Sequence, residues 1–150
     1  MIYLSVCTRS KPENSNTLIS LYDYSRNVEI AVDASSIYEG HNANVQELIR
    51  RHTLQDEDII VFVHDDVEIL STPTKFSKLI GGVAGATNFT RDGSWWTSRN
   101  TGETRGFVWQ GKDDETMTPN YFGPAGQVVV LDGCLIAATY KTLKDIGLSQ

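Results

Sequence analysis

The sequence predicts an α/β fold in which a mainly parallel central sheet is flanked by helices, all within a single domain over residues 1–150. Apolar, strand-like segments alternate with helix-like segments along the chain, which is the pattern of βαβ units. The run Ile59-Ile-Val-Phe-Val63 has no polar residue, as expected of a parallel strand buried on both faces. With 40% hydrophobic and 21% charged residues, the composition is that of an ordinary globular domain.

The elements follow from the spacing of apolar residues and from capping signals. Asn44 and Glu47 have the spacing of a capping box, Thr72-Pro73 is a typical helix start, and Gly147 is a typical C-cap. Residues 88–127 are rich in Gly, Thr, Asn and Asp, and predict loops with a short hairpin at 105–110. The predicted helices are 17–24, 44–52, 72–80 and 142–146; the predicted strands are 2–6, 28–32, 59–63, 83–87 and 128–131, the last continued by 135–138.

Charge and apolar patterning limit the binding partners and the cellular location that the sequence allows. The net charge of -6, without a strong basic patch, disfavours binding to nucleic acid. No apolar run approaches the roughly 20 residues of a membrane span, and the first residues do not resemble a secretory signal. Cys7 and Cys134 lie in apolar segments and are interpreted as core thiols, so the predicted location is a reducing cytoplasm.

Polar groups follow three predicted strands. The first strand leads into Cys7-Thr8-Arg9, the second into Asp33, and the third into His64-Asp65-Asp66. Open α/β sheets bind ligands just beyond the carboxyl ends of their strands. If the three strands are neighbours, these groups converge on one crevice, and the sequence predicts a ligand site there.

The paired aspartates are the sharpest of these features. Two adjacent carboxylates after a buried strand repel each other, and a divalent cation relieves that repulsion. Their oxygen atoms suit Mn²⁺ or Mg²⁺, which commonly also bind substrate phosphates. Successive strand side chains point in opposite directions, so we expect Asp66 to bind the metal and Asp65 to bind a sugar or ribose hydroxyl. The alternative is that both residues simply form a turn.

Other candidate residues have two readings each. Thr8, Arg9 and Asp33 are either loop or turn residues or ligands of a nucleobase, and Asn42 is either a helix cap or a donor ligand. Trp95 and Trp96 either anchor a loop or stack on an acceptor sugar. Asp132 is either a turn residue or the catalytic base that takes a proton from the acceptor hydroxyl.

The segment Asp58-Ile-Ile-Val-Phe-Val-His-Asp-Asp-Val-Glu-Ile69 resembles the metal-binding segment of family 2-like glycosyltransferases, in a bacterial and viral branch with His-Asp-Asp in place of Asp-x-Asp. The tract Val129-Val-Leu-Asp-Gly-Cys-Leu-Ile-Ala-Ala138 resembles the later strand of that family, where Asp132 and Gly133 would lie by sugar and acceptor. The resemblance implies a GT-A, Rossmann-like fold, a nucleotide-sugar donor such as a UDP-sugar, and a hexosyltransferase-like activity. In this family the metal neutralises the diphosphate leaving group.

The chain departs from the family at its end, because members normally continue past the helix that ends near Gly147 and often carry their base there. The first alternative is therefore a non-catalytic nucleotide-sugar-binding domain, or a fragment of a larger transferase. The second is a nucleotidyltransferase, which would need a glycine-rich phosphate loop that residues 8–15 lack. The third is a carbohydrate-binding module on Trp95 and Trp96, which leaves Asp65-Asp66 unexplained.

Overall fold

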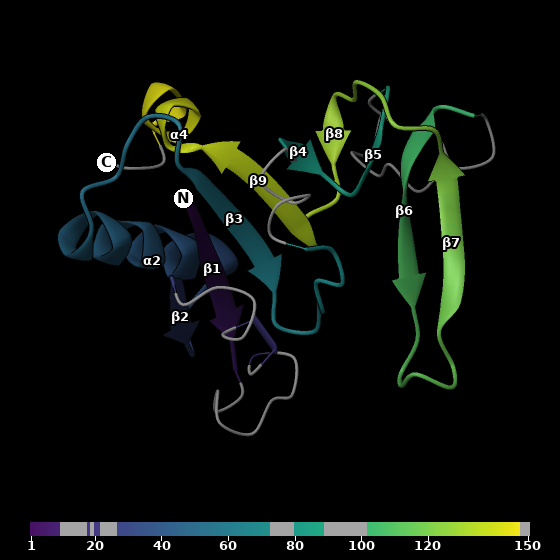
Figure 1. Cartoon of the computed structure of the whole chain (residues 1–150), viewed down its shortest axis with the longest axis horizontal. Coiled ribbons are helices and arrows are strands. Elements are labelled where there is room, and N and C mark those ends of the chain that lie inside the picture. Colours follow the sequence, from purple (N-terminus) through teal and green to yellow (C-terminus); the bar gives the residue numbers. More distant parts are fainter. Residues whose placement is uncertain (10–17, 19, 22–26, 73–79, 89–101, 148–150) are drawn as a thin grey trace. The chain divides into compact units, whose positions relative to one another are not determined.

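The structure is a computed structural model that describes residues 1–9, 18, 20–21, 27–72, 80–88 and 102–147. It is a mixed α/β structure with two sheets (Figure 1). Contacts divide the chain into two compact units, the first formed by Met1–Gly81 with Gly133–Gln150 and the second by Gly82–Asp132. The expectation of a single domain stays a prediction.

The sheet of the first unit is built around a parallel trio of strands. β1 (Ile2–Thr8) pairs in parallel with β2 (Val28–Val32) on one side and with β3 (Ile59–His64) on the other. β9 (Leu135–Thr139) then pairs antiparallel with β3. The full sheet order is β2-β1-β3-β9-β4, where β4 is Gly81–Gly82. The strands predicted at 2–6, 28–32 and 59–63 are therefore confirmed, and the first and third extend further toward their carboxyl ends.

Both faces of β1 and β3 are buried. On one face, α2 (Ile37–Arg51) and α4 (Tyr140–Ile146) contribute to a core of Tyr3, Val45, Leu48, Ile60 and Leu143. The residues that alternate with these on the strands are fully buried as well, and they are Leu4, Val6, Val61 and Val63. Burial on both faces explains why residues 59–63 lack polar alternation. In the part of the chain that the structure describes, no helix is both long and apolar enough to cross a membrane.

The helix ends are set by capping residues. In α4, Thr139 is the N-cap and Gly147 is the C-cap with φ 86°, as the sequence predicts for that glycine. In α2, the N-cap is Ser36, whose Oγ accepts from the Glu39 N–H at 3.1 Å. The prediction that this helix begins at Asn44 is wrong, because Ser36 is the actual N-cap and Asn44 lies buried in the helix interior.

The second unit is an antiparallel sheet with the order β7-β6-β5-β8. These strands are Thr118–Gly123, Thr104–Gln110, Ala84–Ala86 and Val130–Leu131. Ala84, Ala86 and Phe122 are its buried centre, and Val108 and Val130 pack against them. A bulge between Gly106 and Phe107 requires glycine, since Gly106 has φ 117° and a Cβ there would lie 2.1 Å from the Val83 carbonyl oxygen.

The structure corrects three further predictions. The strands do not form one mainly parallel sheet. The first sheet is mixed, because β9 pairs antiparallel with β3, and the second sheet is antiparallel throughout. The 135–138 segment does not continue the 128–131 strand but belongs to the other sheet. The hairpin is longer than the predicted 105–110, since β6 and β7 span Thr104–Gln110 and Thr118–Gly123; Pro119 lies on the edge strand, where a missing N–H is tolerated. Most of the predicted helices 17–24 and 72–80 lies outside the described residues.

Candidate functional site

The carboxyl ends of the three parallel strands meet at one edge of the first sheet. Thr8 is in register with Val32, and Cys7 is in register with His64. The backbone N–H of Asp33 donates to the Thr8 carbonyl oxygen at 3.0 Å. The structure thus brings together the strand-end residues that the sequence singled out, and we call this place the strand-end edge.

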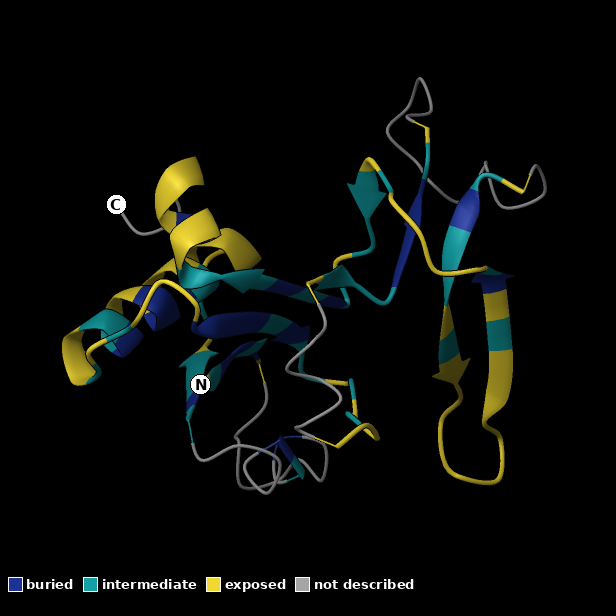
Figure 2. Ribbon diagram, turned by 45° about the horizontal axis from the view of Figure 1, so that its top comes forward, coloured by how far each residue is buried: buried dark blue, intermediate teal, exposed yellow. Residues whose placement is uncertain are grey.

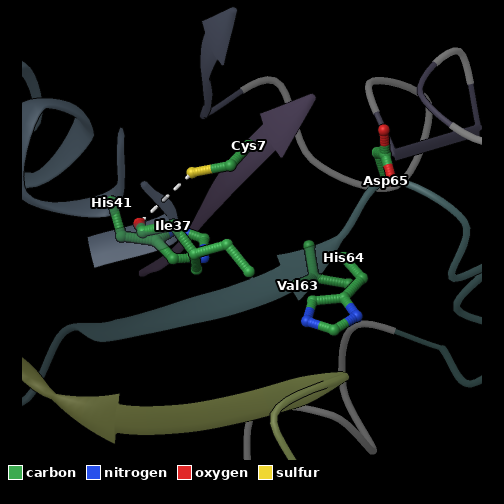
Figure 3. Close-up of a pocket in the computed structure, with 6 residues that line it drawn as sticks. All are labelled: Cys7, Ile37, His41, Val63, His64 and Asp65. Carbon is green, nitrogen blue, oxygen red and sulfur yellow. Dashed lines mark hydrogen bonds between the residues drawn. The ribbon is translucent and has the colours of Figure 1, made fainter. Parts of the chain in front are cut away.

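A cavity of about 140 Å³ lies at this edge (Figure 3). β1 contributes Cys7, whose thiol donates to the Ile37 carbonyl oxygen at 3.6 Å, and β3 leads into Asp65. Burial raises the pKa of the Cys7 thiol, and the nearby Asp65 carboxylate raises it further. The cavity therefore has a neutral thiol on one side and a carboxylate at the end of β3. The residues that line it are Cys7, Ile37, His41, Val63, His64 and Asp65.

A hydrogen-bonded chain of three side chains lies between α2 and β1 beside this cavity. The Asn44 Nδ2 group donates to Ser5 Oγ at 2.9 Å and to the Val6 carbonyl oxygen at 2.9 Å. Ser5 Oγ lies 2.8 Å from Nδ1 of His41. The Ser5 hydroxyl can donate to Nδ1, in which case the proton of a neutral His41 lies on Nε2, or it can accept from a protonated Nδ1 through its second lone pair.

His41 is held as a neutral base. Burial lowers the pKa of its imidazole to about 4, and the proximity of His64 contributes to the same shift. The ring also makes an edge-on contact with Phe62, with ring centroids 5.1 Å apart. At neutral pH the cavity is thus lined by an uncharged imidazole, held at Nδ1 by Ser5, which neither attracts anions nor repels cations.

Close packing of α2 against the sheet requires a glycine at this edge. A Cβ on Gly40 would lie 2.5 Å from the sulfur of Cys7 and 3.1 Å from the Cβ of Ala34. The absence of that Cβ allows the first turns of α2 to approach β1 and β2. This approach places His41 over the strand ends.

Asp33 adopts an unusual backbone conformation. It follows β2 with φ 53°, and it is the one non-glycine residue in the described part of the chain with a positive φ. Aspartate tolerates this left-handed region better than most residues, but the conformation still costs energy. The turn directs the exposed Asp33 away from the regular strand path just where its N–H pairs with Thr8.

The paired aspartates lie at the end of β3, with Asp65 half-buried and Asp66 exposed. Across the described ranges, no three or more His, Cys, Asp and Glu side chains are grouped closely enough to hold a metal ion by themselves. Magnesium-type cations need no such group, because they are commonly held by one or two carboxylates together with substrate phosphates and water. The donor chemistry of Asp65 and Asp66 fits that mode.

The remaining predicted site residues are distributed more widely. Arg9 is exposed directly after β1, and Asn42 is exposed on α2. Gly133 borders His64, since a Cβ on this glycine would lie 3.9 Å from His64 Nε2. Asp132 belongs to the second unit, where its N–H donates to the Ala84 carbonyl oxygen at 2.9 Å. Trp95 and Trp96 lie outside the described residues.

Sequence reasoning missed the side chains beneath the edge, namely Ser5, Gly40, His41 and Asn44 as a sheet-facing set. A signal was present: Ile37, His41, Asn44, Val45 and Leu48 recur at helical spacing, which would have placed His41 and Asn44 on the buried face of a longer helix.

Comparison of the chain with protein-family models, with curated proteins and with solved structures found no match. The function is therefore argued from the site itself.

Proposed function

We propose that this protein is a metal-dependent glycosyltransferase that moves a sugar from a nucleoside-diphosphate sugar, with a UDP-sugar as first candidate, to a hydroxyl acceptor. The observation that carries the proposal is the convergence of Thr8, Asp33 and His64-Asp65 at one edge of a parallel strand trio. Nucleotide ligands commonly bind at this kind of edge in open α/β sheets. The resemblance of residues 58–69 to the glycosyltransferase segment points to the same edge.

In this proposal the residues of the edge divide the donor between them. Thr8, Arg9 and Asp33 bind the nucleoside, with Cys7, Asn42 and Gly133 as further donor contacts. Asp65 accepts hydrogen bonds from a sugar or ribose hydroxyl, and Asp66 binds Mn²⁺ or Mg²⁺. When bound, the cation supplies Lewis-acid stabilisation of the diphosphate leaving group.

Catalysis in the proposal requires a base for the acceptor hydroxyl, and Asp132 is the candidate. Trp95 and Trp96 are the candidate acceptor platform. The alternative is a domain that binds the nucleotide sugar without transferring it, since the same strand-end residues would support binding alone. Release of free nucleotide from a donor incubated with Mn²⁺ separates the two, because an active site of this kind transfers some sugar to water.

The experiment is a thermal-shift panel of UDP-, GDP- and dTDP-sugars with and without Mn²⁺. A ligand that binds only the folded state raises the melting temperature, by an amount that grows with its concentration relative to Kd. We expect at least one donor to stabilise the protein in the presence of Mn²⁺. If none of them does so, the proposal fails.

Asp66→Ala sharpens this experiment. We expect the variant to lose the Mn²⁺-dependent part of the thermal shift while it retains the melting temperature of the unliganded protein, because Asp66 is exposed. Asp114→Ala is the matched control, since Asp114 is an exposed aspartate in the turn of the second unit and should leave the shift unchanged. A full metal-dependent shift in Asp66→Ala would move the metal site elsewhere.

A further inference from the structure

The β6–β7 hairpin of the second unit has two different faces. Val108 and Phe122 point inward and pack against Ala84 and Ala86. Residues that alternate with them face outward, where Phe107 is 46% exposed, Trp109 53% and Tyr121 68%. Figure 2 shows the long exposed stretches on both strands. An exposed cluster of large aromatic rings is unusual on a protein surface and indicates a binding function.

Strand register places these rings next to one another. Phe107 is directly opposite Tyr121, and Trp109 is opposite Pro119. The rings of Phe107 and Trp109 meet edge to face, with centroids 5.8 Å apart and an interplanar angle of 89°. We call Phe107, Trp109, Pro119 and Tyr121 the aromatic face.

Side-chain hydrogen bonds cross-link the hairpin along its length. The buried Thr104 hydroxyl donates to the Phe122 carbonyl oxygen at 2.6 Å near one end. Thr118 donates to the Gln110 carbonyl oxygen at 3.2 Å near the turn, and Asn120 donates to the Gln110 side chain at 3.2 Å. The aromatic face is thereby held in shape before any ligand binds, which lowers the entropic cost of binding.

Charge excludes several classes of partner. Arg105 is the one charged residue of β6 and β7, and its guanidinium donates to the Gly102 and Thr104 carbonyl oxygens at 2.8 Å. The turn between the strands has one lysine against three acidic residues, Asp113, Asp114 and Glu115. Single-stranded nucleic acids also stack on aromatic rings, but they need a positively charged groove beside them. An anionic membrane surface likewise attracts basic segments, not acidic ones. The aromatic face therefore suits a neutral ligand.

Size separates a small neutral ligand from a protein partner. The rings extend over two residue steps along the strands and one strand spacing across them, roughly 7 Å by 5 Å between backbone positions. A stable protein–protein interface takes roughly 20–30 residues from each partner, whereas the aromatic face has four. The face matches a few ring-sized groups instead.

We propose that the aromatic face of the β6–β7 hairpin binds a neutral carbohydrate, with the C–H faces of pyranose rings stacked on Trp109, Phe107 and Tyr121. The Trp109 indole N–H and the Tyr121 hydroxyl provide hydrogen-bonding groups at the ring edges for sugar hydroxyls. This binding requires neither nucleotide nor metal. It stands independently of the transferase proposed above.

The experiment is native affinity electrophoresis of the full chain in gels containing soluble neutral polysaccharides: a β-glucan, an α-glucan, a galactomannan and a glycol-chitin, without nucleotide or divalent cation. We expect at least one polysaccharide to retard the protein. Trp109→Ala and Tyr121→Ala should weaken that retardation at least tenfold in the polysaccharide concentration required. Tyr38→Ala, which removes an 86% exposed tyrosine from α2 in the first unit, should leave it unchanged.

Circular dichroism and the melting temperature of each variant establish that the hairpin variants remain folded, which is expected because all three rings face outward. The proposal is overturned if none of the four polysaccharides retards the protein, or if Tyr38→Ala reduces retardation as much as Trp109→Ala does. It is also overturned if sedimentation shows a dimer that Trp109→Ala dissociates, since the face would then join two copies of the chain. A failed nucleotide-sugar panel would leave this result untouched.

Discussion

The strand-end edge of the first unit and the aromatic face of the second unit present their side chains in opposite ways. At the edge, His64 and Asp65 are half-buried beside a hydrogen-bonded layer of Asn44, Ser5 and His41. On the hairpin, the apolar rings of Phe107, Trp109 and Tyr121 are exposed. The edge thus holds polar atoms whose loss would leave other buried atoms unpaired, whereas the aromatic face exposes surface that the fold does not require. Stability should therefore respond very differently to truncation in the two regions.

The largest effect is expected from Asn44→Ala. Asn44 is 4% exposed and donates to both Ser5 Oγ and the Val6 carbonyl oxygen. Its truncation therefore removes the hydrogen bond that each of these two acceptor atoms receives from Asn44. We expect a loss of about 1–3 kcal/mol in the free energy of unfolding. Urea denaturation measures it, with Asn42→Ala as the matched control on the exposed side of the same helix. An equal cost for the two variants would mean that Asn44 has no special role beneath the edge.

The position of Asn44 also shows what sequence reasoning could reach. Asn44 with Glu47 and Ser36 with Glu39 have the same capping spacing, and local pattern alone does not choose between them. The choice is made by tertiary contact, because Gly40 lets the earlier turns of α2 pack on β1. Choosing the later start hid His41 and Asn44 from the predicted site.

The strand ends, by contrast, were predictable, because an apolar run followed by polar residues marks both the strand and its exit from the core. Strand direction was not predictable in the same way. Residues 135–138 are apolar in either orientation, so burial is encoded but antiparallel pairing with β3 is not. The length of the hairpin was underestimated because Pro119 argues against a strand unless that strand is at an edge.

A smaller effect is expected from titration of His41. Its pKa in the folded protein is about 4, below the 6.5 of an unperturbed imidazole, so between these values the unfolded state binds more protons. The stabilisation from keeping this ring neutral is fully present above pH 6.5 and is lost as the pH falls toward 4. We expect on the order of 1–2 kcal/mol of pH-dependent stability from this group, since part of the ring is still solvated.

Urea denaturation at pH 7.5, 6.0, 5.0 and 4.5 measures this dependence in the wild type and in His41→Asn. Asparagine keeps a polar side chain but does not titrate, so its curve should be flatter over this range. His52→Asn is the matched control, because His52 is a second half-buried histidine that packs on Tyr3. Identical pH slopes for wild type and His41→Asn would show that His41 does not titrate as proposed.

The smallest effect on stability is expected from Tyr121→Ala. Tyr121 is 68% exposed, and it contributes to the fold mainly through its cross-strand position opposite Phe107. Such cross-strand pairs contribute roughly 0.2–1 kcal/mol, so the free energy of unfolding should change by no more than that. A loss as large as that of Asn44→Ala would show that the aromatic face is part of the core. If the loss is small while carbohydrate retardation falls tenfold, then binding and folding are separable on the hairpin. The same separation should be harder to reach at the strand-end edge, where the groups beside the cavity are also groups that hold α2 on the sheet.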